Sequence, residues 1–166
     1  MVCNDYQTLY GVSVDSPMGP ITLMANDTAI VKTFFGSLPR AVPEGDVPLL
    51  QLAKIQMEEY LAGKRFIFEL PLAPEGTVFQ QSVWRALLAI PYGETKSYGQ
   101  IAEKIGNPKA CRAVGMANNR NPIGIIIPCH RVISANGDLV GYAGGLEYKQ
   151  FLLKLETTYA LYRNNK

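Results

Sequence analysis

The spacing of apolar residues changes midway along the chain, from the period of a strand to the period of a helix. Residues 8–35 alternate apolar and polar positions between turn signals, which predicts short strands joined by tight turns. After residue 77 the apolar residues recur every three or four positions. The segment PLAPEG, at 71–76, contains two prolines and a glycine. We therefore place a boundary there and expect an N-terminal α/β domain over 1–76 and a C-terminal domain over 77–166.

The rest of the N-terminal half predicts one helix and one further strand. Residues 48–63 have helical periodicity and end at a glycine, whereas FIFEL at 66–70 has the composition of a strand. The apolar stripe of the helix is expected to consist of Leu49, Leu52, Ile55 and Leu61.

The C-terminal half predicts mainly helices. Residues 78–90 form an amphipathic pattern, and two short helices at 97–106 and 110–120 flank a tight turn, which is typical of a helix-turn-helix. IGIII at 123–127 predicts an apolar strand, which is followed by a long Gly-rich loop. The last helix, 146–162, carries a stripe of Tyr148, Leu152, Leu155 and Tyr159.

The charge is distributed unevenly between the two halves. The whole chain has a net charge of +2, but residues 1–76 contain five bases and nine acids, a net −4, and residues 77–166 contain eleven bases and five acids, a net +6. The C-terminal half is thus suited to a polyanion such as DNA, although chance asymmetry on solvated faces would give the same numbers.

No apolar run approaches a membrane span of roughly 20 residues. The first ten residues lack the pattern of a signal peptide, so we expect a cytoplasmic protein that does not contact membranes.

Cysteine and histidine are scarce. The chain has three cysteines, Cys3, Cys111 and Cys129, and a single histidine, His130. An odd number of cysteines argues against a disulfide framework, and no Cys-x-x-Cys pair is present. We expect no metal site, because one histidine and unpaired cysteines lack the spacing of zinc ligands.

The second helix of the predicted helix-turn-helix is unusually rich in small residues. Ala110, Ala113, Val114 and Ala117 share one face, with Gly115 beside them. A face of this kind would fit the minor groove, which is about 6 Å wide. Arg112 stands among them and could enter a base stack at the place of an extruded base. The alternative is that the alanines pack into a core and Arg112 is an ordinary surface base.

The sequence PCHRV places a potential nucleophile next to a potential base. Cys129 and His130 are neighbours, and neighbours on a strand point to opposite faces, so a direct pair would need a bend or a bridging water. Pro128 would help to end the strand. A base needs an orienting group, and Glu156 on the last helix is a candidate, unless it is a solvated surface residue. A cysteine hydrolase, a redox or structural cysteine, and a transferase that moves a group onto sulfur remain open on these residues alone.

Taken together, the motifs resemble the O6-alkylguanine-DNA alkyltransferase (methylated-DNA–protein-cysteine methyltransferase) family. The resemblance covers residues 77–156 almost continuously and rests on IPYGET, RAVG, NRNP, PCHRV and GYAGGL in this order. SPMGPITLMAN in the N-terminal half matches more loosely. The resemblance implies an α/β (α+β) fold, with a ribonuclease-H-like small sheet and helix followed by a helical domain that contains the helix-turn-helix.

The resemblance also implies a function. The protein would repair O6-alkylguanine, and more weakly O4-alkylthymine, in double-stranded DNA that it binds through the minor groove as a monomer. It would move the alkyl group onto Cys129, once per molecule, with no cofactor. His130 would act through a water to deprotonate Cys129, Glu156 would orient His130, and Asn121 would organise the turn beneath the site.

Other residues would contact the DNA and the flipped base. The resemblance implies that Tyr98 contacts the base and the phosphate that rotates during flipping, and that Arg112 fills the vacated stack. The carbonyls of Cys129 and Val132 would accept from the guanine amine, and the backbone N–H of Ala143 would meet the O6 atom. Tyr142 would help to form the pocket wall. Some relatives have Ser at position 143 or Pro at position 124, so the adduct size is open. A helix-turn-helix regulator or a lesion-binding protein without transferase activity is the alternative.

Overall fold

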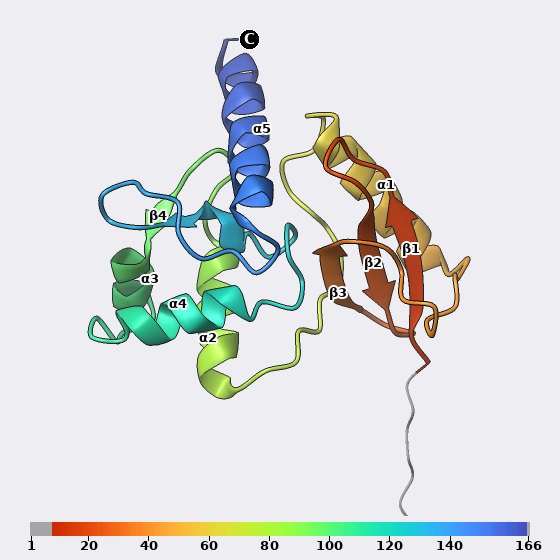
Figure 1. The fold of residues 1–166 in the computed structure, drawn as a ribbon, viewed down its shortest axis with the longest axis horizontal. Helices are drawn as coiled ribbons and strands as arrows, with labels where there is room; N and C mark the ends of the chain where they lie inside the picture. The colour runs from red at the N-terminus through yellow and green to blue at the C-terminus, as the bar shows by residue number, and fades with distance from the viewer. Residues whose placement is uncertain (1–7, 166) are drawn as a thin grey trace, which may run out of the picture.

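The computed structural model describes residues 8–165, so Cys3 and most of the first ten residues considered above lie outside it. Strands β1 (Tyr10–Val14), β2 (Ile21–Ala25) and β3 (Ile30–Phe35) form an antiparallel sheet in the order β1-β2-β3. β2 is the central strand and is buried along its whole length. The strands predicted within 8–35 are confirmed, and β3 is the edge strand that faces the helical part of the molecule (Figure 1).

Helix α1 (Pro48–Leu61) begins with a proline in its first turn and packs on the sheet. Its buried face consists of Leu50, Ala53, Gln56, Met57 and Tyr60. The predicted stripe was therefore wrong at Leu52, which is 45% exposed, and at Ile55, which is 52% exposed, whereas Leu49 and Leu61 pack against the core and are half-buried. The apolar residues of this helix surround most of it, and the position of the sheet decides which of them are buried.

The strand predicted at 66–70 is not formed. Instead, the buried side chain of Gln56 satisfies the backbone of Glu69: its Nε2 donates to the Glu69 carbonyl at 3.2 Å, and its Oε1 accepts from the Glu69 N–H at 2.8 Å. These groups would otherwise pair with a neighbouring strand. The chain then contacts β3 briefly, through a single bridge between Leu72 and Ile30.

The predicted helices of the C-terminal part are confirmed as α2 (Val78–Leu88), α3 (Tyr98–Lys104) and α4 (Cys111–Asn119). α2 and α3 each begin with a capping box, in which Thr77 pairs with Gln80 and Ser97 with Gln100. α3, the turn at 105–110 and α4 form the expected helix-turn-helix. The indole of Trp84 on α2 donates to the carbonyl of Ala117 on α4 at 2.9 Å, which fixes α4 against the core.

The small residues of α4 were expected to share one exposed face, and they do not. Val114 and Ala117 are buried in the core, whereas Ala113 is exposed. Both of the interpretations considered for this helix thus apply to part of it, because one side of α4 packs on α2 and the other faces solvent.

The strand predicted at 123–127 is also absent, and a tight turn takes its place. The N–H of Ile127 donates to the carbonyl of Ile123 at 3.0 Å, and Ile125 has a φ of 70°. Positive φ is rare for a β-branched residue and stores strain. The turn leads into a 3₁₀ helix, η1 (Cys129–Arg131), and then into β5 (Val132–Ile133), which pairs in parallel with β4 (Lys96–Ser97).

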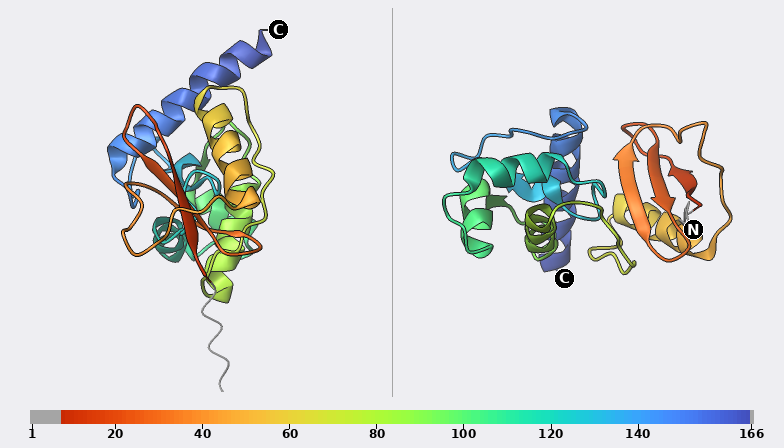
Figure 2. Two further views of the ribbon diagram at one scale, coloured as in Figure 1. Left: turned by 90° about the vertical axis from the view of Figure 1, so that its right-hand side faces the viewer. Right: turned by 90° about the horizontal axis from the view of Figure 1, so that it is seen from below.

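Helix α5 (Leu146–Asn164) lies between the two parts of the chain and confirms the last predicted helix (Figures 1 and 2). Its fully buried residues are Lys149, Leu152 and Glu156, at spacings of three and four. Tyr148 and Tyr159 of the predicted stripe lie beside these buried residues. Tyr148 stacks on Phe35 of β3 with ring centroids 4.1 Å apart. Within residues 8–165, no helix is long and apolar enough to cross a membrane.

The buried face of α1 can be tested by a matched pair of substitutions. Leu50 is fully buried and Leu52 is 45% exposed. We expect Leu50→Ala to lower the free energy of unfolding by about 2–5 kcal/mol, because it leaves a cavity in the core. Leu52→Ala should change it by less than about 1 kcal/mol. Urea unfolding of the two variants measures the difference, and a larger loss for Leu52→Ala would contradict the structure.

Candidate active site

Cys129 lies against a pocket of about 200 Å³ between the two parts of the chain. β3 forms one wall with Thr33, Phe34 and Phe35, and the Gly-rich loop forms another with Tyr142, Ala143 and Gly144. Two buried polar atoms from the lining, Thr33 Oγ1 and Asn118 Oδ1, have no hydrogen-bond partner among residues 8–165. The surface of the pocket is mainly apolar, which is the usual character of a small-molecule or base-binding site.

The 3₁₀ helix separates the side chains of Cys129 and His130. Successive residues of a 3₁₀ helix are about 120° apart around its axis. Cys129 lines the pocket, whereas the fully buried His130 points toward α5. The expectation that the two side chains diverge is confirmed, but the reason given from strand geometry was wrong.

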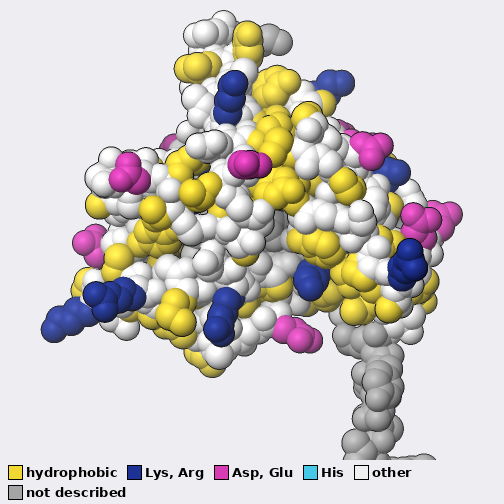
Figure 3. Space-filling view, viewed as in Figure 1, with side chains coloured by type: hydrophobic (Ala, Val, Ile, Leu, Met, Phe, Trp, Pro, Cys, Tyr) yellow, Lys and Arg dark blue, Asp and Glu magenta, His cyan; other side chains and the backbone are white. Residues whose placement is uncertain are grey.

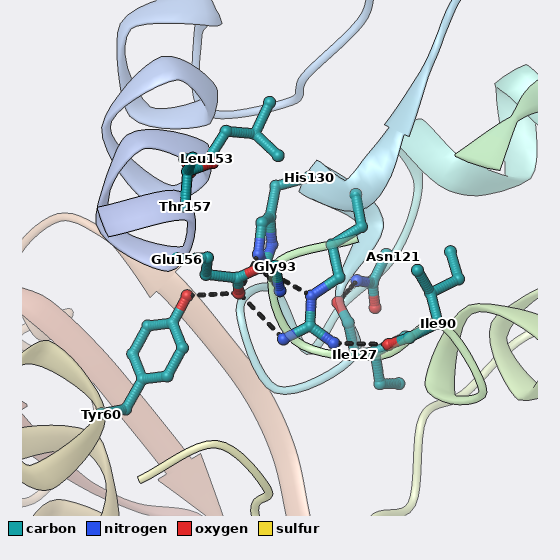
Figure 4. Close-up of polar contacts among 10 residues, drawn as sticks. Tyr60, Ile90, Gly93, Asn121, Ile127, His130, Leu153, Glu156 and Thr157 are labelled. Atoms are coloured by element: carbon teal, nitrogen blue, oxygen red, sulfur yellow. Dashed lines mark hydrogen bonds and ion pairs between the residues drawn. The ribbon is translucent and has the colours of Figure 1, made fainter. Parts of the chain in front are cut away.

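The buried carboxylate of Glu156 contacts His130 (Figure 4) and forms an ion pair with Arg131. His130 Nε2 is 2.7 Å from Glu156 Oε1. Arg131 donates to both carboxylate oxygens, from Nη2 at 2.8 Å and from Nε at 2.9 Å, and its Nη1 donates to the carbonyl of Ile90. The surface alternative for Glu156 is wrong, since this side chain is 1% exposed.

The charges of this network follow from burial and pairing. Burial acts to raise the pKa of Glu156, but the interactions with His130 and Arg131 prevail and hold the pKa well below its ordinary value. Burial lowers the pKa of His130, although Glu156 opposes this. At neutral pH the pair is then a carboxylate and a neutral imidazole. A carboxylate only accepts, so Nε2 carries the imidazole proton and Nδ1 is left as the basic atom.

The basic nitrogen of His130 is available. Nδ1 is buried and has no hydrogen-bond partner among residues 8–165. Burial raises the pKa of the Cys129 thiol, opposed by the side chain of Asn121 and then by the charge of Lys149. The resting protein therefore holds a protonated thiol and, at the next residue, a neutral base, so that activation of the thiol requires transfer of its proton.

Asn121 stabilises the strained turn that precedes Cys129. Its Nδ2 donates to the carbonyl of Ile127 at 2.8 Å, and its Oδ1 accepts from the N–H of Ile123 at 3.0 Å. β3 adds a backbone contact, because the Gly124 N–H donates to the Thr33 carbonyl at 3.0 Å. The turn around Ile125 is thus fixed by one side chain and by the edge of the sheet.

Tyr98 and Val132 lie close to Cys129 but outside the lining of the pocket. Pairing of β4 with β5 places Tyr98, the first residue of α3, next to the segment that carries Cys129. The Tyr98 hydroxyl donates to the carbonyl of Val140 at 2.9 Å. Gly115 lies under its ring, where a Cβ would be 3.8 Å from the ring atoms.

Lys149 connects the Gly-rich loop to the active-site strand. Its buried Nζ donates to the carbonyl of Val132 at 2.6 Å and to that of Val140 at 2.8 Å. Burial lowers the pKa of Lys149 to about 8. The Val132 carbonyl, expected to bind a base, thus already accepts one hydrogen bond, and the Cys129 carbonyl likewise accepts one from Asn118 Nδ2 at 3.2 Å. Each carbonyl retains a second lone pair.

The residues expected to face DNA lie apart from the pocket, along α4. Cys111, Arg112 and Ala113 are exposed, and Ala110 is half-buried just before the helix. Figure 3 shows Lys and Arg side chains over the end of the molecule formed by α3 and α4. This arrangement presents Arg112 to solvent, free to contact a bound partner.

Comparisons with known proteins agree over most of the chain. The family model for the 6-O-methylguanine DNA methyltransferase ribonuclease-like domain matches residues 6–74, and the model for the DNA binding domain of the same family matches residues 78–158. The methylated-DNA–protein-cysteine methyltransferase of Methanosarcina acetivorans is 54% identical over 153 residues, which covers 89% of this chain and 98% of the relative. The methylated-DNA–protein-cysteine methyltransferase of Mycobacterium leprae is 49% identical, over 87% of this chain and 90% of the relative.

The chain belongs to the 6-O-methylguanine DNA methyltransferase family. A solved structure, Mycobacterium tuberculosis OGT in complex with DNA, has a TM-score of 0.83 and 46% identity to it, over 90% of this chain and 94% of the other. The expected α/β fold, with a ribonuclease-like part and a DNA-binding part, is thereby confirmed.

Three buried polar residues of this methyltransferase-family site were not expected from the sequence: Tyr60, Arg131 and Lys149. Lys149 had a local signal, since it lies on the apolar stripe of α5, where a charged residue needs a specific partner. Tyr60 had none, because the Glu156 oxygen that it contacts is 96 residues away.

The lowered pKa of His130 predicts a specific acid sensitivity. In the unfolded chain the pKa of His130 returns to about 6.5, so as pH falls below 7 the unfolded chain binds the proton before the folded protein does. The free energy of unfolding should therefore fall between pH 7 and 5.5. Urea unfolding at a series of pH values should show a smaller slope for His130→Gln than for the wild type. Equal slopes would contradict a neutral buried His130. Glu156 would contribute only at lower pH.

Proposed function

We propose that this chain repairs DNA by transferring the alkyl group of O6-alkylguanine, and more weakly of O4-alkylthymine, to Cys129. The observation that carries the proposal is the position of Cys129 on the pocket wall, next in the chain to a buried His130 that is paired with Glu156, in a chain of this family. The pocket accepts one flipped base, and the transfer occurs once per molecule, since a thioether is stable.

The chemistry uses the resting thiol and the neutral imidazole. His130 Nδ1 takes the thiol proton through a bridging water, and Glu156 stabilises the imidazolium that results. The thiolate attacks the alkyl carbon in line with its bond to O6. The new S–C bond forms as the C–O6 bond breaks, and the electron pair stays on the base, which takes up a proton and becomes guanine. Asn121 is a positioning residue in this scheme, because it fixes the turn before Cys129.

The pocket lining can hold the base in a defined orientation. The second lone pairs of the Cys129 and Val132 carbonyls would accept from the guanine amine, and the Ala143 N–H would donate to O6. Tyr142 lines the pocket and would pack on the base. Tyr98 would contact the base and the phosphate that rotates during flipping. Base flipping is required because a nucleophile cannot reach O6 inside a duplex.

Double-stranded DNA would bind on the exposed side of α4, through its minor groove. The surface there consists of small residues, which allow close approach of a narrow groove: Ala110, Ala113 and Gly115. Arg112 would enter the stack vacated by the base. The net charge of +6 over residues 77–166 supports binding of a polyanion. We further propose that the protein acts as a cytoplasmic monomer and that its domain boundary lies within 71–76.

Alkyl transfer predicts a defined mass change. Incubation with duplex DNA that contains one O6-methylguanine should add about 14 Da to the peptide that contains Cys129, with saturation at one group per molecule. Cys129→Ser should bind the same DNA and gain no mass. Intact-protein and peptide mass spectrometry measure this outcome. Correctly folded wild-type protein that gains no mass would exclude the transferase function.

The proposed role of Arg112 predicts a difference between substrates. Arg112→Ala should slow transfer from duplex DNA by about tenfold or more, and from free O6-methylguanine by less than about twofold, because only the duplex requires flipping. Single-turnover rate constants on the two substrates give the comparison. Arg163→Ala removes another exposed positive charge, at the end of α5, and serves as the control. Equal slowing on both substrates would exclude the proposal that Arg112 enters the stack vacated by the flipped base.

A further inference from the structure

The hydroxyl of Tyr60 reaches the catalytic pair from the N-terminal part of the chain. Tyr60 lies near the end of α1 and is fully buried. Its hydroxyl donates to Glu156 Oε1 at 2.8 Å (Figure 4). The same oxygen contacts His130 Nε2 at 2.7 Å. One carboxylate oxygen thus joins a residue of the ribonuclease-like part to the proposed base.

Glu156 divides its charge among several donors. Oε1 interacts with His130, Tyr60 and the Nη2 of Arg131, and Oε2 accepts from the Nε of Arg131 and from the backbone N–H of Gly93 at 3.3 Å. A donor that stabilises the negative charge of the carboxylate weakens its attraction for a proton on His130. Tyr60 therefore acts directly on the group that orients the imidazole.

The Tyr60 hydroxyl is a permanent and fixed donor. Burial, and then the neighbouring Glu156, raise the pKa of Tyr60 well above its ordinary value, so the hydroxyl keeps its proton throughout the working pH range. The ring packs between Phe68, with centroids 5.3 Å apart, and Tyr92, edge-on at 6.0 Å. These contacts leave the hydroxyl little freedom to turn away from Glu156.

We propose that Tyr60 is a positioning residue for alkyl transfer, through which α1 of the ribonuclease-like part orients the Glu156–His130 pair. This proposal rests on the proposed role of His130 as the base for Cys129. Titratable and charged groups face the pair from every element packed around it: Tyr60 of α1, Tyr92 of the turn after α2, Arg131 of η1, and Lys149 of α5. Tyr60 and Arg131 both donate to the Glu156 oxygen that contacts His130, and of these two residues Tyr60 belongs to the ribonuclease-like part.

Tyr60→Phe removes the hydroxyl and keeps the ring. Without this donor, Glu156 attracts the His130 proton more strongly, so His130 becomes protonated, and unable to act as a base, at a higher pH. Single-turnover transfer from duplex DNA with O6-methylguanine should therefore slow by roughly five- to tenfold at pH 6 and change little at pH 8. An NMR titration provides a second readout without assignment ambiguity, because His130 is the only histidine in the chain.

Tyr92→Phe is the matched control. It removes a neighbouring buried hydroxyl that has no hydrogen-bond partner among residues 8–165, and its rate profile should coincide with that of the wild type. The proposal would be overturned if Tyr60→Phe had the same dependence of rate on pH as the wild type, or if it lost rate equally at all pH values. A merely structural role would not shift the fall in rate at acidic pH, here called the acidic limb of the profile. Absence of transfer by the wild type would instead overturn the function itself.

A second substitution decides the question if Tyr60→Phe fails to fold. 3,5-Difluorotyrosine at position 60 keeps the ring and the hydroxyl but makes the hydroxyl a stronger donor. The acidic limb and the imidazole titration should then move to lower pH, opposite to the change expected for Tyr60→Phe. An unchanged profile with this residue would overturn the proposal.

Discussion

The buried carboxylate of Glu156 is the group on which the rest of the site depends. A charge that is removed from water must be compensated by partners, and loss of one partner leaves the charge at a high energetic cost. Here the partners come from α1, from the turn after α2 and from η1. These three segments can form their contacts with Glu156 only when both parts of the chain and α5 are packed together. The requirement to satisfy one carboxylate thus positions the proposed base.

The nucleophile is arranged on a different principle from the base. Cys129 follows a turn with a strained Ile125, and the turn is stabilised by Asn121 and by the edge of β3. Burial keeps the thiol protonated, while His130 is a neutral imidazole and Glu156 an ionised carboxylate. A buried thiol protected in this way resists reaction with other electrophiles until its proton is removed. The arrangement suits a protein whose nucleophile is consumed in a single reaction.

The ribonuclease-like part contributes directly to the site. Residues of β3 form a wall of the pocket, the Thr33 carbonyl fixes the turn before Cys129, and the Tyr60 hydroxyl contacts Glu156. A small sheet beside a helical DNA-binding part is therefore more than a support. Packing between the two parts completes both the substrate pocket and the hydrogen bonds of the proposed base.

The sequence alone determined the helices, the strands within 8–35, and the family, because periodicity and motif spacing are local. It also identified Cys129, His130, Asn121 and Glu156 as candidates, through the motifs that contain them. The strands predicted at 66–70 and 123–127 did not form, because the Gln56 side chain satisfies the backbone of Glu69 and a tight turn closes around Ile125. The buried face of α1 likewise depends on where the sheet lies. Tertiary structure alone decided the roles of Tyr60, Arg131 and Lys149, since a buried polar group is defined by partners that are distant in the chain.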